Sequence, residues 1–358
     1  MIKSVLTILI AIQISSFWSS AGYCQSAAQL SENEIKSTVF VTVVSHFDRP
    51  WTMKANDLAA LRLLTKNHPN MRWTHLFNPV AYTTPTPLLK EMESYIKDSR
   101  DKHSAEIGVH LHMYRTFVES AGVKYRIRPS VSANKSKGSF DNSGYSVPMT
   151  TYSADEITLM LDFTLSKFQT KRLGVPKTFC AGFYTTSLEL QKRIADKGFN
   201  VSAAAFPPGH EIGAKYAPSW HELSGWNDSV TIRSSPYRVS KKSILPSGNA
   251  PFIKASDGKP LVEIPQNTKI DWMISSKEMK RIIDIHIDLA LKKTPSAVCL
   301  AIHESSAHEY FKKYDEVLDY IDHLKKQNNK VKIRYITATN LRNEFLQYWE
   351  KHDLSHAK

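Results

Sequence analysis

Two pairs of residues in the sequence have the types and spacing of metal ligands. His46 and Asp48 follow an apolar, β-branched run, and His110 and His112 end a second one. The members of each pair are two residues apart, so an extended strand points both side chains to the same side. Neutral imidazole and carboxylate groups are common ligands of zinc and similar ions. We therefore predict a divalent-metal site, most simply for zinc, built from Asp48, His110 and His112.

A third apolar run, at residues 297–302, ends directly in His303. An imidazole titrates near neutral pH, which suits a general acid or base. We predict that His303 is catalytic, as a general acid or base, with a further metal ligand as the alternative. Asp48 is predicted to be catalytic as well as a ligand. The choice of base remains open among Asp48, Asp271 and Glu304.

These residues need a scaffold that brings separate strand ends together, and the sequence predicts one. β-Branched runs alternate with amphipathic segments along most of the chain, which favours a parallel sheet covered by helices. The predicted strands are 39–44, 71–77, 106–110, 177–181, 201–204, 261–264, 297–302 and 331–336. The predicted helices are 56–66, 88–100, 153–171, 187–197, 276–291, 310–326 and 340–350. We predict an α/β fold, a single (β/α) barrel that is distorted and has seven or eight strands.

A barrel of this kind carries its active site at the carboxyl ends of the strands. The predicted ligands and His303 all lie at such ends. Two long segments, 113–152 and 205–260, interrupt the alternation of strands and helices. Both leave from strand ends, so we expect them to overhang the site as loops or small hairpins.

The N-terminus is typical of a secretory signal peptide. Lys3 precedes an apolar run at 5–14, and small and polar residues follow it. We predict a signal peptide at 1–26 and one domain at 27–358, in a protein that is secreted or periplasmic. An uncleaved anchor is the alternative reading of the same segment. No second long apolar run occurs, so no membrane span is expected in the mature chain.

The formal net charge of the 358-residue chain is +13. Its lysines and arginines are scattered, which is typical of a solvated surface, so we predict no nucleic-acid partner. The positive charge leaves an acidic polymer open as the partner. Beyond the signal region only Cys180 and Cys299 remain, too few for a disulfide framework. Both lie in apolar stretches, as two buried thiols or as one disulfide.

The ordered set of motifs resembles the polysaccharide deacetylase (NodB-like) family. The resemblance is carried by Glu106-Ile-Gly-Val-His110, by Thr178-Phe-Cys-Ala-Gly182 and by the strand that ends in His303. It covers about residues 38 to 345, most of the mature chain. It implies a metal-dependent hydrolase that removes N- or O-acetyl groups from a polysaccharide or oligosaccharide.

The sequence departs from the family pattern at three places. The usual first motif has two adjacent aspartates, whereas Arg49 follows Asp48 here. The usual second histidine lies four residues after the first, where this chain has Tyr114, so His112 must take its place. The usual arginine before Ala-Gly is Cys180.

The segment from His46 to Trp51 is similar to the His-x-Asp opening of certain retaining α-mannosidases, which share a related barrel. This resemblance makes His46 a possible fourth ligand. It keeps a glycoside hydrolase on a related barrel as an alternative, and a non-catalytic glycan-binding protein is a third. Polar and aromatic residues near the predicted site are expected to contact the sugar, with core packing as the alternative for the aromatic ones: Arg49, Trp51, Tyr184 and Tyr237.

Overall fold

The computed structural model describes residues 30–131, 142–208, 218–246, 250–327 and 330–356. The predicted signal peptide at 1–26 lies outside these residues. Nine strands form one sheet in the order β6-β7-β5-β4-β3-β2-β1-β8, and β9 also pairs with β1. The strands are β1 (Thr38–His46), β2 (Trp73–Phe77), β3 (Glu106–Leu111), β4 (Thr178–Ala181), β5 (Val201–Ser202), β6 (Tyr237–Arg238), β7 (Val262–Glu263), β8 (Ser296–His303) and β9 (Lys332–Tyr335).

The helices that cover the sheet follow the strands along the chain. They are α1 (Glu32–Lys36), α2 (Ala55–Asn67), α3 (Leu89–His103), α4 (Arg115–Ser120), α5 (Ala154–Thr170), α6 (Leu188–Asp196), α8 (Pro218–Ser224), α9 (Ser276–Leu291), α10 (Ala307–Gln327) and α11 (Ala338–His356). Short 3-10 turns occur at η1 (Pro50–Thr52), η2 (Pro79–Tyr82), η3 (Met149–Thr151), η4 (Gly182–Tyr184), η5 (Asp271–Met273) and η6 (Glu304–Ser306).

All eight predicted strands are present, and each predicted helix overlaps an observed one. The predicted distorted (β/α) barrel is thereby confirmed, but its sheet has nine strands among the described residues rather than seven or eight, because the antiparallel strand β6 is added at one edge. Its parallel sheet curls but remains open, because it begins at the antiparallel edge strand β6 and ends at β8. One isolated parallel bridge, Ile270 to Ala301, links the segment after β7 to β8.

Strand β1 pairs with three other strands of the sheet. β8 pairs with it from Val39 to His46, so β2 and β9 must share its other edge. Its β-branched residues suit a strand that is buried on both faces. Val41 and Val43 belong to the larger apolar cluster, which also contains residues of the covering helices. Phe40 belongs to the second cluster, inside the curled sheet.

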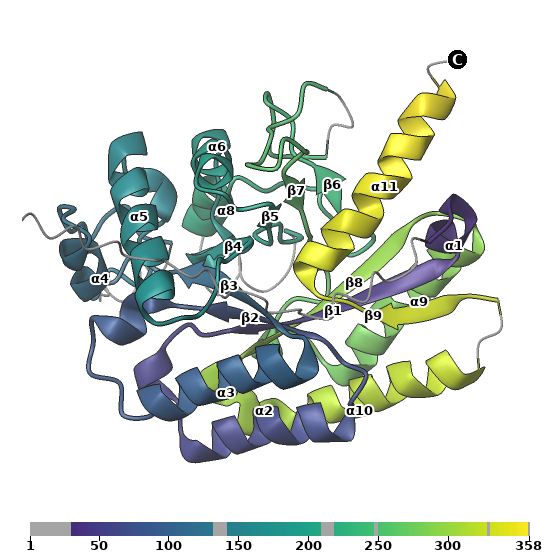
Figure 1. The fold of residues 1–358 in the computed structure, drawn as a ribbon, viewed down its shortest axis with the longest axis horizontal. Helices are drawn as coiled ribbons and strands as arrows, with labels where there is room; N and C mark the ends of the chain where they lie inside the picture. The colour runs from purple at the N-terminus through teal and green to yellow at the C-terminus, as the bar shows by residue number, and fades with distance from the viewer. Residues whose placement is uncertain (1–29, 132–141, 209–217, 247–249, 328–329, 357–358) are drawn as a thin grey trace, which may run out of the picture.

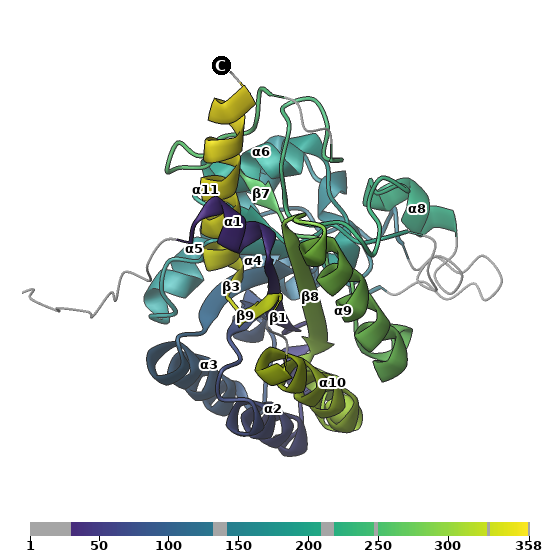
Figure 2. The same ribbon diagram turned by 90° about the vertical axis from the view of Figure 1, so that its right-hand side faces the viewer.

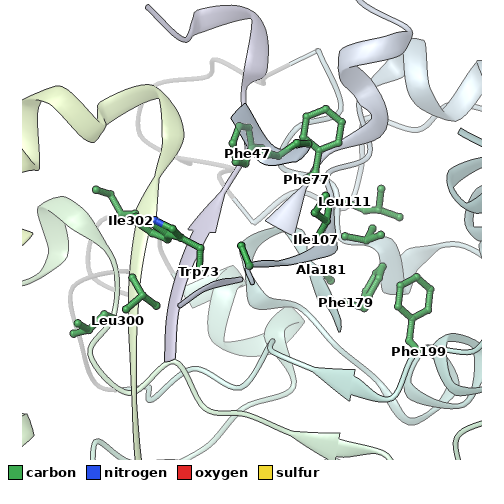
Figure 3. Packing of buried hydrophobic residues seen from close by; sticks show 14 of the residues in the cluster. Phe47, Trp73, Phe77, Ile107, Leu111, Phe179, Ala181, Phe199, Leu300 and Ile302 are labelled. Atoms are coloured by element: carbon green, nitrogen blue, oxygen red, sulfur yellow. The ribbon is translucent and has the colours of Figure 1, made fainter. Parts of the chain in front are cut away.

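Helices α2, α3 and α10 lie along one side of the sheet (Figures 1 and 2). Figure 3 shows part of the larger cluster, with Phe77, Phe179 and Ile302 among the labelled side chains. Burying each such side chain stabilises the fold by about 1.5–3 kcal/mol. At the other face, Phe345 of α11 packs on Phe40, with ring centroids 6.1 Å apart.

The two long segments contain little regular structure within the described residues. The first holds α4 and η3, and the second holds α8 and β6. Cys180 and Cys299 are both buried and free, so the thiol alternative is the one observed. Among the described residues, no helix is long and apolar enough to cross a membrane.

Candidate metal centre and active site

The curled sheet brings the predicted residues together at the carboxyl ends of its strands. The register of β1 and β8 places His46 beside His303, and that of β3 and β4 places His110 beside Cys180. β1 and β3 are separated by β2, and neighbouring strands are about 4.8 Å apart. The rings of His46 and His110 nevertheless lie 4.7 Å apart by their centroids. Their side chains converge because both lie on the concave face of the sheet.

Asp48, His110 and His112 present three ligand atoms to one point. His112 Nε2 lies 2.5 Å from Asp48 Oδ1 and 3.1 Å from His110 Nε2. His110 Nε2 lies 3.6 Å from Asp48 Oδ1. All three residues are buried. Although the two histidine nitrogens lie next to it, Asp48 Oδ1 has no hydrogen-bond partner within the described part of the chain.

Backbone carbonyl groups fix the tautomers of both histidines. His110 Nδ1 donates to Cys180 O at 3.0 Å, and His112 Nδ1 donates to Tyr145 O at 2.8 Å. With Nδ1 used in this way, the other ring nitrogen of each histidine, Nε2, points towards Asp48. Burial lowers the pKa of His110, which keeps that ring neutral. Three lone pairs facing one another without a proton between them fit a cation, and this second-shell pattern is typical of metal-ligating histidine.

Asp48 is held in place by hydrogen bonds to Glu304 and Tyr145. Glu304 accepts hydrogen bonds from the backbone N–H of Asp48 and of Arg49, both at 3.0 Å. The hydroxyl of Tyr145 donates to Asp48 Oδ2 at 2.6 Å. Burial acts to raise the pKa of Asp48, but His112, together with His110 and His303, holds it well below its usual range. Asp48 is therefore an ionised carboxylate with one oxygen towards the histidines and one towards Tyr145.

His46 lies beside these residues but has a different partner. Its Nε2 lies 3.0 Å from Gln266 Oε1, and Gln266 Nε2 donates to Ala203 O at 2.7 Å. The amide orientation makes Oε1 the acceptor, so His46 Nε2 is the donor. Burial lowers the pKa of His46 well below its usual value. The ring is neutral and has Nδ1 left for a ligand role, so His46 remains a candidate fourth ligand.

His303 faces the same cluster from β8. Its Nε2 lies 3.8 Å from Asp48 Oδ2, and its Nδ1 donates to Asp271 Oδ2 at 2.5 Å. The Asp271 carboxylate also accepts hydrogen bonds from Ser306 Oγ and Tyr314 OH. Burial lowers the pKa of His303, but the charge of Asp271 and its hydrogen bond outweigh this effect and raise the pKa to about 9.

One pocket contains most of the predicted residues. It is lined by His46, Asp48, His110, His112, Tyr145, Phe183, Tyr184, Ile270, Trp272, Met273 and His303. Arg49 is exposed, and its guanidinium lies 4.1 Å from the ring centroid of Tyr145. Trp51 and Tyr237 lie outside the pocket lining: Trp51 packs edge-on against Tyr114, and the hydroxyl of Tyr237 donates to Ile244 O. The structure thus brings Tyr184, but not Trp51 or Tyr237, to the predicted site.

Several residues of the site were not found from the sequence. Tyr145 stacks on His112 with ring centroids 4.3 Å apart and contacts Asp48, but it lies in a long segment without periodicity. Gln266 lies after β7, in a segment that contains no recognisable motif. Trp272 and Met273 line the pocket from η5. No pattern in the sequence singles these residues out, because their contacts depend on the path of two loops.

The loop after β4 is shaped to fit His112. A Cβ atom on Gly182 would lie 2.5 Å from His112 Nδ1, so only glycine permits this approach. The next two residues, Phe183 and Tyr184, have φ values of 53° and 58°. Such values are uncommon for large side chains, and strain of this kind clusters at functional sites. The loop turns both aromatic side chains into the pocket.

The fold is similar to that of solved structures of the deacetylase type. One, described as a "putative polysaccharide deacetylase" from Mycobacterium smegmatis, matches with a TM-score of 0.52 at 10% identity over 90% of this chain and 95% of that one. Another, described as a "putative glycoside hydrolase/deacetylase" from Parabacteroides distasonis, matches with a TM-score of 0.56 at 14% identity. That match covers 90% of this chain and 73% of the other.

No family model and no curated protein matches the chain. At the identities of the structural matches, the likeness establishes the fold alone. The chain has a (β/α) barrel fold similar to that of these deacetylase-type structures, as the motifs predicted. Its chemistry has to be argued from the site.

Proposed function

We propose that this protein is a metal-dependent hydrolase that removes N- or O-acetyl groups from a polysaccharide or oligosaccharide. One observation carries the proposal. The lone pairs of Asp48 Oδ1, His110 Nε2 and His112 Nε2 converge at the mouth of a deacetylase-type barrel, next to an imidazole whose pKa is raised. A metal site with an adjacent proton donor provides the two catalytic groups for hydrolysis of an acyl group.

Asp48, His110 and His112 would hold the cation, with zinc as the expected ion from its preference for nitrogen and carboxylate ligands. When bound, such an ion acts as a Lewis acid towards an acyl carbonyl and lowers the pKa of a water. Glu304 and Tyr145 orient Asp48, and two backbone carbonyls orient the histidines.

Two residues that line the pocket, His303 and Asp48, are placed to transfer protons. His303 has Nδ1 committed to Asp271, so only Nε2 can exchange a proton with the substrate. With a pKa of about 9 it is protonated at neutral pH, which suits the general acid that protonates the leaving amine or hydroxyl. Asp48 Oδ2 is the carboxylate oxygen in the pocket that remains to accept the proton of the attacking water.

The dimensions of the pocket support a small acyl group. Its volume is about 60 Å³. Taking about 15 Å³ for each water, it has room for roughly four waters. A sugar ring does not fit in this space, so the acyl group would enter the pocket while the glycan stays outside. Tyr184 in the pocket and Arg49 near its rim would be the first predicted residues to meet the substrate.

Glycoside hydrolysis has less support. A retaining glycosidase needs two carboxyl groups about 5 Å apart at the scissile bond. Among the described residues, Asp48 is the only carboxylate that lines the pocket. Asp271 and Glu304 are fully buried behind it, bonded to His303 and to the backbone of Asp48 and Arg49.

Incubation of the purified protein with a panel of acetylated glycans tests the proposal. We expect free acetate without new reducing ends. New reducing ends without acetate would instead establish a glycosidase, and saturable glycan binding with neither product would establish a binding protein. A secreted or periplasmic location is a further part of the proposal, supported by the composition of residues 1–26. Mass spectrometry of the exported protein should find this segment removed.

A further inference from the structure

A groove continues from the pocket along the surface of the barrel. It shares Trp272 and Met273 with the pocket, and it runs from η5 to the first turns of α9 and α10. Its volume is about 800 Å³, compared with about 60 Å³ for the pocket. A groove of this size accommodates sugar rings, and its continuity with the pocket places them next to the acyl group that would enter there.

Trp272 stands where the two spaces meet. It is half-buried and contributes to the lining of both the pocket and the groove. An aromatic side chain in this position offers an apolar face to a sugar ring on the groove side. Because the ring stacks on carbon–hydrogen bonds, this contact does not depend on the charge of the glycan.

The acidic residues of the groove are paired with cations. It is lined by two glutamates, Glu278 and Glu316, each of which pairs with a cation: Arg281 at 2.6 Å and Lys280 at 2.6 Å, respectively. The negative charges of the groove are therefore already neutralised.

The lysines of the groove are Lys269, Lys312 and Lys313. Lys313 Nζ donates to two backbone carbonyls, Asp271 O at 2.8 Å and Ile274 O at 2.9 Å, and forms no direct ion pair within the described residues, although the charges of Asp271 and Glu309 act on it. Lys312 is exposed and forms no ion pair within the described part of the chain. Arg49 adds a further exposed cation beside Tyr145. The groove and the nearby rim are thus positively charged.

We infer that the groove binds the glycan chain next to the residue that is deacetylated, and that this chain is anionic, with carboxylate-bearing sugars. The inference rests on the proposed function for the position of the acyl group. It adds a class of substrate to that function. Lys312 would favour glycans that carry carboxylates, whereas Trp272 would stack on a sugar ring whether or not the ring is charged. Electrostatic attraction to an open groove is screened by salt, so binding of such a chain weakens as ionic strength rises.

Two matched probes test the inference. The first is an O-acetylated oligomer of uronic acid, and the second is the same oligomer after its carboxyl groups are reduced to alcohols. Acetate release is measured on both probes for the wild-type protein and for Lys312→Gln and Trp272→Ala. Lys326→Gln is the control, since Lys326 is also exposed on α10 and lies fourteen residues, about 21 Å, further along the helix.

We expect Lys312→Gln to raise KM for the acidic probe by about 2- to 5-fold, the size of an exposed charge contact. It should leave KM for the reduced probe unchanged, and Lys326→Gln should change neither. Trp272→Ala should raise KM for both probes by about 2- to 10-fold. Equal KM values for the two probes, together with no effect of Lys312→Gln, would overturn the inference.

The failure of the proposed function gives a different result. In that case neither probe releases acetate, and the groove is tested by calorimetric titration with the unacetylated uronic acid oligomer. Binding that weakens in Lys312→Gln but not in Lys326→Gln would support the groove as a binding site for an anionic glycan, independently of the proposed deacetylation. Absence of binding to the wild-type protein overturns it.

Discussion

His303 donates its Nδ1 proton to Asp271 across 2.5 Å, and this hydrogen bond decides what His303 can do. The bond leaves Nε2 to face the pocket, and the buried charge of Asp271 outweighs the desolvation of the ring and raises the pKa of His303 to about 9. Asp271 is itself fully buried and bonded to Ser306 and Tyr314. It acts on the reaction through His303 and is a positioning residue.

Replacing Asp271 with asparagine should move the alkaline limit of activity. A general acid must be protonated, so activity is lost as the pH rises through the pKa of His303. If the pKa returns from about 9 to its usual value near 6.5, the protonated fraction at pH 8 falls by about 30-fold. The pH profile of kcat/KM measures this shift. Ser306→Ala, which removes a hydrogen bond to Asp271 but keeps its charge, should shift the limit much less. An unchanged limit in Asp271→Asn would exclude His303 as the acid.

Tyr145 should control metal affinity through Asp48. Tyr145→Phe removes the hydroxyl that orients Asp48 Oδ2 and should weaken zinc binding by about 10- to 100-fold, the usual effect of a second-shell partner. Tyr184→Phe is the matched control, since Tyr184 lines the same pocket but its hydroxyl has no hydrogen-bond partner among the described residues. Competition titration with a chelating dye measures both affinities. Equal affinities for the two variants would contradict the assignment of Asp48 as a ligand.

A methyl group at position 182 should disturb the same site sterically. The Cβ atom of Gly182→Ala would lie 2.5 Å from His112 Nδ1, so the ring must move away from its ligand position. We expect a loss of zinc affinity of at least about 10-fold. At Gly122, which has a positive φ of 75°, a Cβ meets nothing within 4 Å. Gly122→Ala should therefore cost about 1 kcal/mol of stability and leave zinc affinity unchanged.

Glu263 should make the stability of the fold depend on pH. It is fully buried on β7 and accepts hydrogen bonds from the backbone N–H of Ala204 and Ala205, yet burial raises its pKa to about 7. The folded protein therefore holds a proton that the unfolded chain releases above its usual pKa. Stability is lost as the pH rises from about 4.5 to 7, by up to about 3 kcal/mol.

Glu263→Gln removes this titration because the amide stays neutral. Urea unfolding at several pH values should find that the variant gains stability relative to the wild-type protein as the pH rises through this range. A constant difference between the two proteins would show that the raised pKa has no effect on folding.

The sequence predicted the scaffold well because its signals are local. The β-branched run of β1 and the capping box of Ser153 and Glu156 each depend on neighbours within a few residues, and both occur in the structure. The alternation of strands and helices then restricts the fold to a parallel sheet covered by helices. The sequence does not predict that β9 and β2 pair with the same edge of β1. This arrangement arises because β8 pairs with β1 from Val39 to His46 and so occupies the opposite edge.

The site was predicted in part for the same reason. His46, Asp48, His110, His112 and His303 end strands whose carboxyl ends meet, so their shared pocket follows from the fold. Tyr145 could not be found this way, because it reaches Asp48 from a long segment without a repeating pattern. Trp51 and Tyr237 are aromatic residues near a motif, but residue type and position in the sequence do not specify the direction of a side chain in a loop or hairpin.

The most direct test of the account is acetate release by protein from which metal has been removed with a chelator, measured as zinc is added back. We expect no acetate without metal and a rise that reaches its maximum at one equivalent of zinc, with Asp48→Ala inactive throughout. Full release of acetate by the metal-free protein, or by Asp48→Ala, would contradict the assignment of Asp48, His110 and His112 as a catalytic metal site.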